Sequence, residues 1–316
     1  MREPAPLLVV LGPTATGKTE VAVEVALLSG GEVVSADSML VYKYMDVGTA
    51  KPTSKERQGI THHLIDIVAP DQEFSVAHYQ KMAQDTIADI RRRSKLPILA
   101  GGTGLYIQSV IDGYKFGEVG IDYDLREKLH NYAHLHGKMA LHDYLKKVDP
   151  DTASRLHPND QKRITRALEI YEITGKPASS LHAGKKKLWY KDLFGLHMSR
   201  DQLYDQVNKR VDKMLAQGLV QEVSKLLQAG YDTGLVSMQG LGYKEIAAYL
   251  KGQIDLERAV YLIKRDTRRF AKRQLTWFRR DSRIKWINVK EYGGAREIAC
   301  EIISQAEGVS KGVSNH

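Results

Sequence analysis

The 316-residue sequence contains a single cysteine, Cys300. One thiol excludes a disulfide framework and any zinc site built on cysteines. The chain also lacks an apolar run approaching the roughly 18 residues of a membrane-spanning helix. Its first apolar run, residues 7–11, leads directly into a glycine-rich loop, which does not fit a cleaved signal peptide. These absences predict a soluble, cytoplasmic protein that is not bound to a membrane.

The composition excludes wholesale disorder, because 42% of the residues are hydrophobic and 27% are charged. The length predicts about two domains, or one domain with a large insertion. Lys and Arg number 47 against 38 Asp and Glu, a net charge of +9. This basic excess favours an anionic partner without naming it.

Strand and helix patterns alternate in the first third of the chain. Short apolar runs predict strands at residues 7–11, 32–36, 63–68 and 97–100. Helical spacing predicts helices at residues 20–28 and 76–93. The alternation indicates an α/β fold with a parallel sheet.

The alternation stops near residue 115, and residues 118–190 are almost wholly helical and polar in pattern. The predicted helices there cover residues 125–134, 139–147 and 161–174. Beyond them we expect a strand at 193–197, helices at 202–217, 220–229, 244–251 and 256–280, and a late strand at 284–289. We therefore predict an α/β core in residues 1–117 and 192–316, interrupted by a helical insertion domain at residues 118–191.

A phosphate-binding pattern follows the first predicted strand. It fits G-x-x-x-x-G-K-[ST] and consists of Gly12, Pro13, Thr14, Ala15, Thr16, Gly17, Lys18 and Thr19. The glycines let successive backbone N–H groups converge on phosphate oxygens at a helix N-terminus. Lys18 adds charge at the outer phosphate, and the Thr19 hydroxyl can ligate Mg²⁺. The pattern predicts a P-loop NTPase-like core that binds a diphosphate or triphosphate, without saying that hydrolysis follows.

Two polar residues come directly after other predicted strands. Asp37 follows the second strand, and Thr103 lies in the Gly-Gly-Thr-Gly segment after the fourth. Ligands of open parallel sheets bind at the carboxyl ends of strands, so both should face the phosphate loop. Asp37 can then accept a proton from a nucleophile. The alternative for each is a turn residue without a catalytic part.

No clear Walker B segment, an apolar run ending in an acid, is present. The nearest candidate, residues 63–66, is short, which counts against a motor-type ATPase.

Basic residues recur along the predicted helix at 256–280. Lys264, Arg268 and Lys272 form one column at a spacing of four, and Arg265, Arg269 and Arg273 form another. Their repulsion destabilises the helix unless something anionic faces them. Three apolar residues at a spacing of seven should supply its core face: Ile263, Phe270 and Trp277. Lys162, Arg163 and Arg166 repeat the basic pattern in the insertion. Such surfaces suit a nucleic-acid backbone, and a solvated face without a partner is the alternative.

Together these stretches resemble one family, the bacterial tRNA dimethylallyltransferases (tRNA isopentenyltransferases). The matching segments are GPTATGKT at 12–19, SADSMLVYKYMDVGTAKP at 35–52, GGTGLY at 101–106, HPNDQKRITRALEIYEITGKP at 157–177, QGLGYKE at 239–245 and TRRFAKRQLTWFRR at 267–280. They run in family order over nearly the whole chain. The resemblance implies transfer of a dimethylallyl group from dimethylallyl diphosphate to N6 of the tRNA adenosine immediately 3′ of the anticodon. The phosphate loop would then hold a diphosphate leaving group rather than ATP.

The resemblance also implies a role for each matching residue. Asp37 would be the general base or orienter of the adenine amine, and Thr103 would position the flipped base. Arg126 and Arg210 would join residues 12–19 around the diphosphate, with Mg²⁺ on Thr19. The residues implied to contact the tRNA anticodon stem-loop are Asp37, Ser38, Met39, Leu40, Thr103, Arg126, Gln161, Lys162, Arg163, Ile164, Thr165, Arg273, Gln274, Thr276, Trp277 and Arg279. We expect a monomer.

The chain departs from the family pattern at three positions. Leu40 stands where Gln is usual, Tyr44 where Gly is usual, and Gln206 where an Arg is often found. The first two would alter the lip of the base site, and the third removes one phosphate-facing cation.

Two rival functions remain on the sequence alone. One is a P-loop kinase that phosphorylates a small molecule with ATP, and the other is a non-catalytic RNA-binding protein with a relic phosphate loop.

Overall fold

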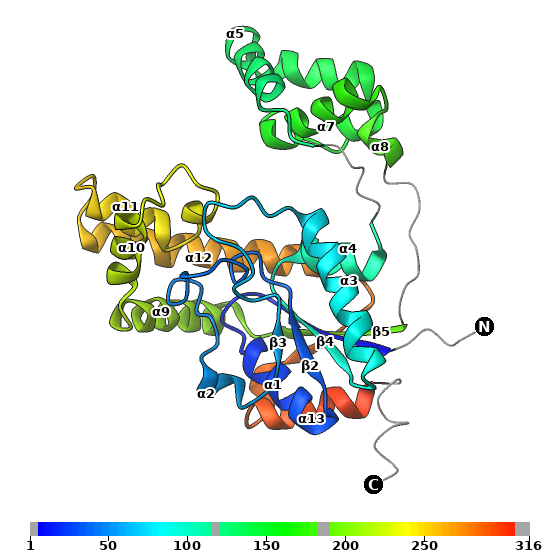
Figure 1. Ribbon diagram of the computed structural model, residues 1–316, viewed down its shortest axis with the longest axis vertical. Helices are drawn as coiled ribbons and strands as arrows, with labels where there is room; N and C mark the ends of the chain where they lie inside the picture. The colour runs from blue at the N-terminus through cyan, green and yellow to red at the C-terminus, as the bar shows by residue number, and fades with distance from the viewer. Residues whose placement is uncertain (1–5, 115–119, 182–189, 307–316) are drawn as a thin grey trace. The chain divides into compact units, whose positions relative to one another are not determined.

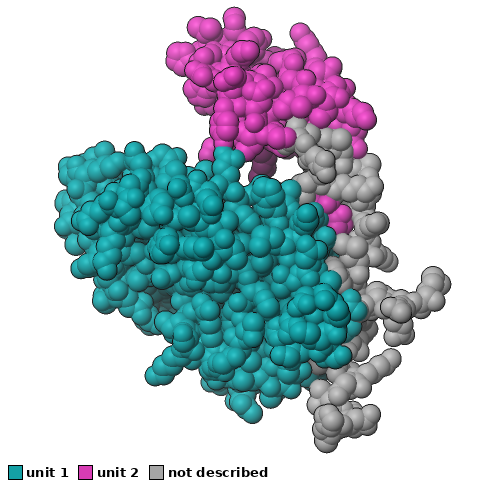
Figure 2. Space-filling model, viewed as in Figure 1, with its two compact units in different colours: residues 1–111, 188–316 teal, residues 112–187 magenta. Residues whose placement is uncertain are grey.

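The computed structural model describes residues 6–114, 120–181 and 190–306. The chain forms two compact units, drawn in Figure 1 and coloured separately in Figure 2. The core unit comprises residues 1–111 and 188–316, and the insertion unit comprises residues 112–187. Within the described ranges, no helix is both long enough and apolar enough to cross a membrane.

The core unit is built on a six-stranded sheet in the order β3-β2-β4-β1-β5-β6. Its strands are β1 (Pro6–Leu11), β2 (Glu32–Ser35), β3 (His62–His63), β4 (Pro97–Gly101), β5 (Tyr190–His197) and β6 (Ile284–Asn288). Every neighbouring pair is parallel, and β1 lies between β4 and β5. The predicted α/β fold with a P-loop-like parallel sheet is therefore confirmed.

Alternation along β1 explains how the sheet is covered on both faces. Leu7 and Val9 pack with α3 (Val76–Arg92) and α4 (Gly104–Asp112), whereas Leu8 and Val10 pack with α1 (Lys18–Ser29) and α13 (Ala295–Gln305). Successive side chains of a strand point to opposite faces, so an unbroken apolar run is required when both faces are buried.

Four helices form a separate layer of the core unit: α9 (Arg200–Ala216), α10 (Leu219–Gln228), α11 (Tyr243–Leu250) and α12 (Leu256–Phe278). Two short helical turns, α2 (Ser54–Arg57) and η1 (Ser237–Gln239), lie in the connecting loops, and η2 (Val289–Glu291) follows β6. The loop after β2 inserts Val41 and Met45 into the hydrophobic core of this layer, beside Val223 and Tyr243. The loop that carries Asp37 is thereby fixed at its middle as well as at its ends.

The insertion unit is helical: α5 (Tyr123–Val148), α6 (Pro150–Ala153), α7 (Gln161–Thr174) and α8 (Ala178–Leu181). Its hydrophobic core includes Leu141, Leu145 and Leu168. The two helices expected at 125–134 and 139–147 form α5, which is interrupted at Gly137, where φ is +86° and ψ is 160°. Glycine is the residue that accepts such a positive φ without strain.

One sequence prediction is wrong, and a second is wrong at one residue. The strand expected at 63–68 is reduced to His62–His63, because Leu64 and Asp66 have φ of +61° and +57°, which breaks the extended backbone. On α12, Ile263 is buried and Trp277, although half-buried, packs against the hydrophobic core, as predicted, whereas Phe270 is only half-buried. The buried face is formed by Ala259, Ile263, Thr267, Ala271, Gln274 and Phe278.

Candidate active site at the carboxyl ends of β1, β2 and β4

The carboxyl ends of three strands meet at one edge of the sheet. The register pairs Leu11 with Gly101 and Ser35 with Ala100. Beyond β2, the backbone N–H of Thr103 donates to the carbonyl of Ala36 at 3.1 Å. A Cβ on Gly101 would lie 2.2 Å from that same oxygen, so only glycine allows this approach. The segments that carry Asp37 and Thr103 are therefore adjacent, as predicted.

The phosphate loop has the curled conformation that its glycines predict. Gly12 and Gly17 have φ of +148° and +81°, and a Cβ on Gly12 would lie 2.5 Å from the carbonyl oxygen of Leu196. The Thr16 hydroxyl donates to the carbonyl of Pro13 at 2.9 Å, and the Lys18 ammonium donates to the same oxygen at 2.6 Å. These bonds close the loop on itself.

Two cations and one carboxylate influence each other at the loop. Burial and, to a smaller extent, the charge of Arg210 lower the pKa of Lys18 to about 7, and the charge of Asp37 opposes both effects. Burial likewise lowers the pKa of Arg210, again opposed by Asp37. Arg210, on α9, donates to the carbonyl of Thr49 at 2.9 Å. A site that holds poorly hydrated positive charge without a full counter-charge favours an anionic ligand.

Asp37 and Thr103 also make contacts typical of turn residues. One carboxylate oxygen of Asp37 accepts the N–H of Met39 at 2.8 Å. The Thr103 hydroxyl accepts the N–H of Ser38 at 3.0 Å and donates to the Ser38 hydroxyl at 3.3 Å. These bonds orient both side chains, so the turn interpretation and the catalytic interpretation are compatible. Met39 and Leu40 continue the segment and are half-buried.

Helix α12 locks the two glycine-rich loops together. The buried amide of Gln274 accepts the N–H of Thr14 at 2.9 Å and donates to the carbonyl of Gly102 at 2.9 Å. A Cβ on Gly104 would lie 2.4 Å from the Trp277 ring. The structure thus gives Gln274 and Trp277 contacts inside the protein, which sequence reasoning did not foresee, because the partners are some 170 to 260 residues away in the chain.

The exposed side of α12 keeps its basic character. Arg273, Thr276 and Arg279 are exposed, as a nucleic-acid contact requires. The rest of the two basic columns is partly neutralised within the chain. The partners are Asp212 for Lys264 (2.6 Å), Asp266 for Arg265 (2.9 Å) and Arg269 (3.3 Å), and the Asn208 amide oxygen for Arg268 (2.8 Å). The anion that the columns require is therefore supplied in part by α9 and by α12 itself.

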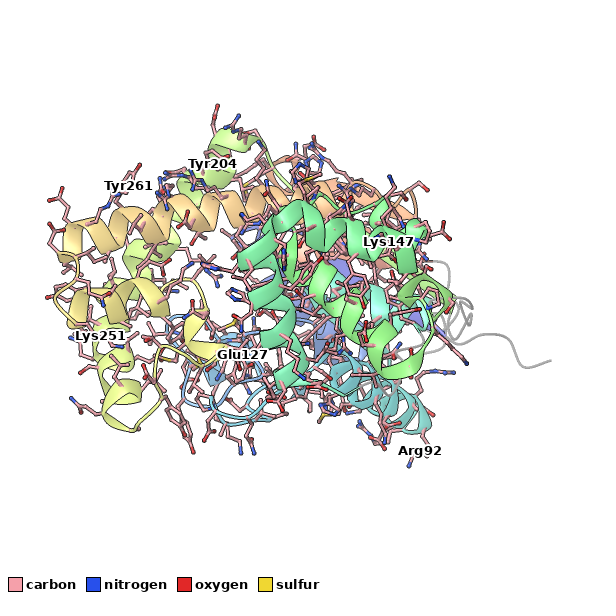
Figure 3. All side chains as sticks on the ribbon, turned by 90° about the horizontal axis from the view of Figure 1, so that it is seen from above. Arg92, Glu127, Lys147, Tyr204, Lys251 and Tyr261 are labelled. Atoms are coloured by element: carbon pink, nitrogen blue, oxygen red, sulfur yellow. The ribbon has the colours of Figure 1, made fainter. Side chains whose placement is uncertain are left out.

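Aromatic rings accompany these cations. Tyr204 of α9, labelled in Figure 3, has the guanidinium groups of Arg200 and Arg268 5.1 and 5.9 Å from its ring centre. Tyr261 of α12 pairs with Arg258 in the same way at 5.2 Å. Cation–π contacts of this kind attract the guanidinium groups to the faces of the rings.

In the insertion unit, Arg126 makes a two-pronged ion pair with the fully buried Glu169, each bond 2.9 Å long. Arg166 also binds Glu169. Burial works to raise the pKa of Glu169, but the hydrogen bonds from Arg126 and Arg166 outweigh it and hold that pKa below its usual value. The approach of Arg126 to a diphosphate remains a prediction.

The predicted tRNA-contacting segment 161–165 begins α7. Lys162 and Arg163 are exposed, and Gln161 and Thr165 are half-buried. Ile164 has no exposed surface and belongs to the hydrophobic core of the insertion unit. A contact between its side chain and tRNA is therefore ruled out in this structure.

The acid of the short Walker B candidate has another use. Asp66 forms an ion pair with the buried ammonium of Lys51. Among the residues that the structure describes, no cluster of three His, Cys, Asp or Glu side chains is placed to hold a metal. The Thr19 side chain is exposed in the first turn of α1. Its hydroxyl oxygen is a ligand type that Mg²⁺ accepts, alongside substrate phosphates and water.

Comparison with known proteins gives one consistent result. The model of the family described as IPP transferase matches residues 40–281. A tRNA dimethylallyltransferase of Desulforudis audaxviator is 54% identical, and the match covers 97% of this chain and 99% of that protein. A tRNA dimethylallyltransferase of Pelotomaculum thermopropionicum is 52% identical, and the match covers 96% of this chain and 97% of that protein.

Solved structures agree. The tRNA isopentenylpyrophosphate transferase of Bacillus halodurans is 43% identical, with a TM-score of 0.71 over 97% of this chain and 98% of its own. A eukaryotic dimethylallyltransferase acting on tRNA is 28% identical, with a TM-score of 0.80 over 95% of this chain and 78% of its own. With its phosphate loop, its juxtaposed Asp37 and Thr103 and these relatives, the chain belongs to the IPP transferase family.

Proposed function

We propose that this chain transfers the dimethylallyl group of dimethylallyl diphosphate to N6 of the tRNA adenosine that is 3′-adjacent to the anticodon, and releases diphosphate. The relatives named tRNA dimethylallyltransferases support this activity over the kinase and RNA-binding alternatives. The observation that carries the proposal is the phosphate loop beside Asp37, with Lys18 and Arg210 electrostatically coupled to that carboxylate.

The diphosphate binds in the phosphate loop. Its oxygens accept the convergent backbone N–H groups at the N-terminus of α1. Because the pKa of Lys18 is about 7, part of this side chain is a neutral amine, and the negative charge of the diphosphate raises that pKa and draws a proton onto the amine. Arg210 adds a second, permanently charged donor. The departing diphosphate is therefore neutralised where its charge develops.

The reaction forms one bond and breaks one. The adenine N6 attacks C1 of the dimethylallyl group, the C1–O bond breaks, and its electron pair leaves with the diphosphate. Asp37 orients the amine and accepts the N6 proton, which then passes to solvent. An exocyclic amine is a weak nucleophile, so the alignment imposed by Asp37 and Thr103 supplies a large part of the rate.

A Mg²⁺ ion fits this site as a partner of the substrate rather than as a resident metal. Thr19 would hold it together with the diphosphate oxygens, and its charge would further stabilise the leaving group.

The tRNA contacts are divided between the two units. The exposed cations of α12, including Arg273 and Arg279, and those of α7, including Lys162 and Arg163, bind the anticodon stem-loop backbone. That binding offsets the few kcal/mol needed to remove the adenosine from its stack. We further propose that the protein acts as a cytoplasmic monomer.

Mass analysis of tRNA nucleosides tests the activity. The protein is incubated with Mg²⁺ and unmodified tRNA, with either dimethylallyl diphosphate or ATP. We expect one adenosine per substrate tRNA to gain a C5H8 unit with the diphosphate donor and no change with ATP. Phosphate transfer from ATP would establish the kinase alternative, and tight tRNA binding without product in either arm would establish the RNA-binding one.

A further inference from the structure

We propose that Glu222 of α10 is a positioning residue that holds Arg210 at the diphosphate site by fixing the backbone of residues 46–49. The inference rests on the proposed function, because Arg210 matters only if a diphosphate binds there. Glu222 does not belong to any motif of the sequence analysis, and it acts through the protein rather than on the substrate.

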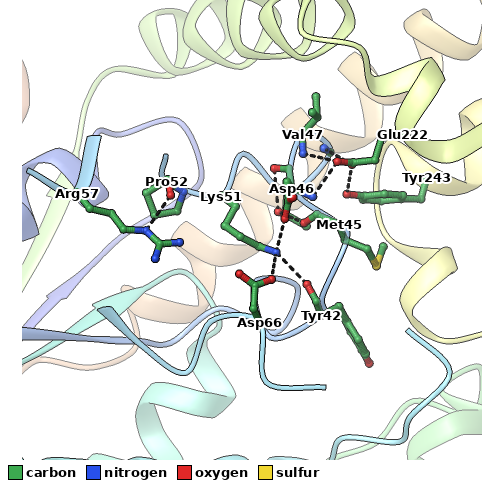
Figure 4. Close-up of polar contacts among 12 residues, drawn as sticks. Tyr42, Met45, Asp46, Val47, Lys51, Pro52, Arg57, Asp66, Glu222 and Tyr243 are labelled. Carbon is green, nitrogen blue, oxygen red and sulfur yellow. Dashed lines mark hydrogen bonds and ion pairs between the residues drawn. The ribbon is translucent and has the colours of Figure 1, made fainter. Parts of the chain in front are cut away.

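The carboxylate of Glu222 gathers three consecutive backbone donors (Figure 4). One oxygen accepts the N–H groups of Asp46 and Val47 at 2.8 and 2.7 Å, and the other accepts that of Gly48 at 3.0 Å. The Tyr243 hydroxyl donates to the second oxygen at 2.7 Å. Three convergent N–H groups form an anion-binding nest, and the anion in this nest is a side chain from another helix.

Packing makes this nest rigid. A Cβ on Gly48 would lie 2.5 Å from the Tyr243 ring, which is fully buried in the helical layer. A side chain at position 48 would therefore push the loop off the ring. On the other side of the loop, the buried Lys51 donates to the carbonyl of Tyr42 at 2.9 Å and pairs with Asp46 and Asp66. The segment is held from both sides by charged groups.

The fixed segment leads directly to Arg210. Thr49 is the residue after the nest, and its carbonyl oxygen accepts the Arg210 guanidinium at 2.9 Å. Arg210 in turn lies within the electrostatic reach of Lys18 and Asp37. A guanidinium presents its donors in a fixed plane, so a carbonyl anchored on one side determines where the other donors point. The geometry therefore connects the Glu222 carboxylate to the orientation of Arg210.

The Glu222→Gln variant tests this connection. An amide oxygen still accepts one set of donors, but the NH₂ group then faces backbone N–H groups, and the nest opens. At metal sites, losing the residue that orients a ligand typically costs about 10- to 100-fold in affinity, and Glu222 orients Arg210 in the same way. We expect inorganic pyrophosphate with Mg²⁺, measured by titration calorimetry, to bind about 10-fold more weakly, while tRNA affinity changes less than about twofold.

A double-mutant cycle separates positioning from general damage. The wild type, Glu222→Gln, Arg210→Ala and the double variant are titrated with pyrophosphate. If Glu222 acts through Arg210, the double variant binds as weakly as Arg210→Ala alone. Glu257→Gln, an identical exchange at an exposed position in the first turn of α12, is the matched control and should bind like the wild type. If Glu222→Gln does not fold, Glu222→Asp, which keeps the charge but is one methylene shorter, replaces it in the same cycle.

Each outcome has a distinct meaning. If the double variant binds pyrophosphate with the same affinity as Arg210→Ala, the proposal is supported. If folded Glu222→Gln binds pyrophosphate as tightly as the wild type, the proposal is overturned. It is also overturned if the losses of affinity caused by the two substitutions multiply in the double variant. Both results leave the proposed function intact. Failure of the wild type to bind pyrophosphate overturns the diphosphate site itself and this inference with it.

Discussion

The replacement Gln274→Met tests how the active-site loops are held. The side chain of Gln274 is 7% exposed and bridges the phosphate loop and the Gly-Gly-Thr-Gly loop with two bonds of 2.9 Å. Methionine has nearly the same shape, so it fills the space without either bond. The exchange therefore isolates the polar contribution of α12 to the site.

The magnitude follows from the two partner groups. A buried polar group that loses its partner costs about 1–3 kcal/mol. The Gly102 carbonyl is buried and bears the full loss, whereas the N–H of Thr14 is half-buried and can recover part of it from water. We expect the free energy of unfolding to fall by about 2–4 kcal/mol. The freed phosphate loop should also raise the Michaelis constant for dimethylallyl diphosphate.

Urea unfolding and tRNA titration together decide the interpretation. The midpoint should fall with an unchanged m-value, and the tRNA dissociation constant should change less than about twofold. For the urea measurement, the matched control is Thr276→Ala at an exposed position two residues on, where the hydroxyl bonds back to the carbonyl of Lys272, so stability should stay within about 0.5 kcal/mol. Lost tRNA affinity at full stability in Gln274→Met would refute this reasoning and make Gln274 a direct tRNA contact.

Three further predictions concern strain and charge. Tyr44 has a φ of +66°, which strains any residue other than glycine. Tyr44→Gly should therefore raise the free energy of unfolding, measured in urea, by about 0.5–1 kcal/mol, and a lower free energy of unfolding would show that the backbone is not strained there. Hydrogen bonds from Arg93 hold the pKa of Glu32 well below its ordinary 4.5; burial opposes this effect, and Lys95 adds to it. The Glu32 carboxylate therefore stabilises the fold fully above pH 4.5, and this stabilisation is lost as the pH falls. Glu32→Gln should therefore lower stability at pH 7 by about 2 kcal/mol and flatten the decline on the acid side; an unchanged pH profile would rule this out. With a pKa of about 7, Lys18 is mostly neutral at pH 8 and becomes protonated when an anion binds beside it. Pyrophosphate binding at pH 8 should therefore take up about 0.9 proton more in the wild type than in Lys18→Met, measured by calorimetry in buffers of different ionisation enthalpy. Equal proton uptake would contradict the lowered pKa of Lys18.

Local patterns were sufficient to predict most of the sheet and the phosphate loop. The run at residues 7–11 and the glycines at 12 and 17 act within a few residues of themselves, and their consequences could be worked out from short-range chemistry. The meeting of Asp37 and Thr103 was also predictable, because parallel strands end on one edge of a sheet.

The contacts that hold this site together could not be predicted in the same way. Gln274 and Glu222 bind backbone groups some 170 to 260 residues away, and their spacing within their own helices carries no sign of it. The failed strand at 63–68 has a related cause, since the positive φ of Leu64 and Asp66 is accompanied by the pairing of Asp66 with Lys51. Tertiary partners decide such segments, whatever their apolar pattern.

Helix α12 illustrates a mixed outcome. Its length and its exposed cations follow from the sequence, but its buried face does so only in part, because the polar Thr267 and Gln274 lie on it and Phe270 does not. A buried amide that is satisfied by two loops cannot be distinguished, in sequence, from an exposed one that binds RNA.

The most direct test of the account is the single-turnover rate of dimethylallyl transfer to tRNA in the Asp37→Asn variant. Asparagine keeps an oxygen for the Met39 N–H, so the turn survives, but the amide cannot accept the N6 proton. We predict a rate lower by about 10²-fold or more, with tRNA and pyrophosphate affinities within about twofold of the wild type. A wild-type rate in this variant would contradict the assignment of Asp37 as the base that prepares the adenosine.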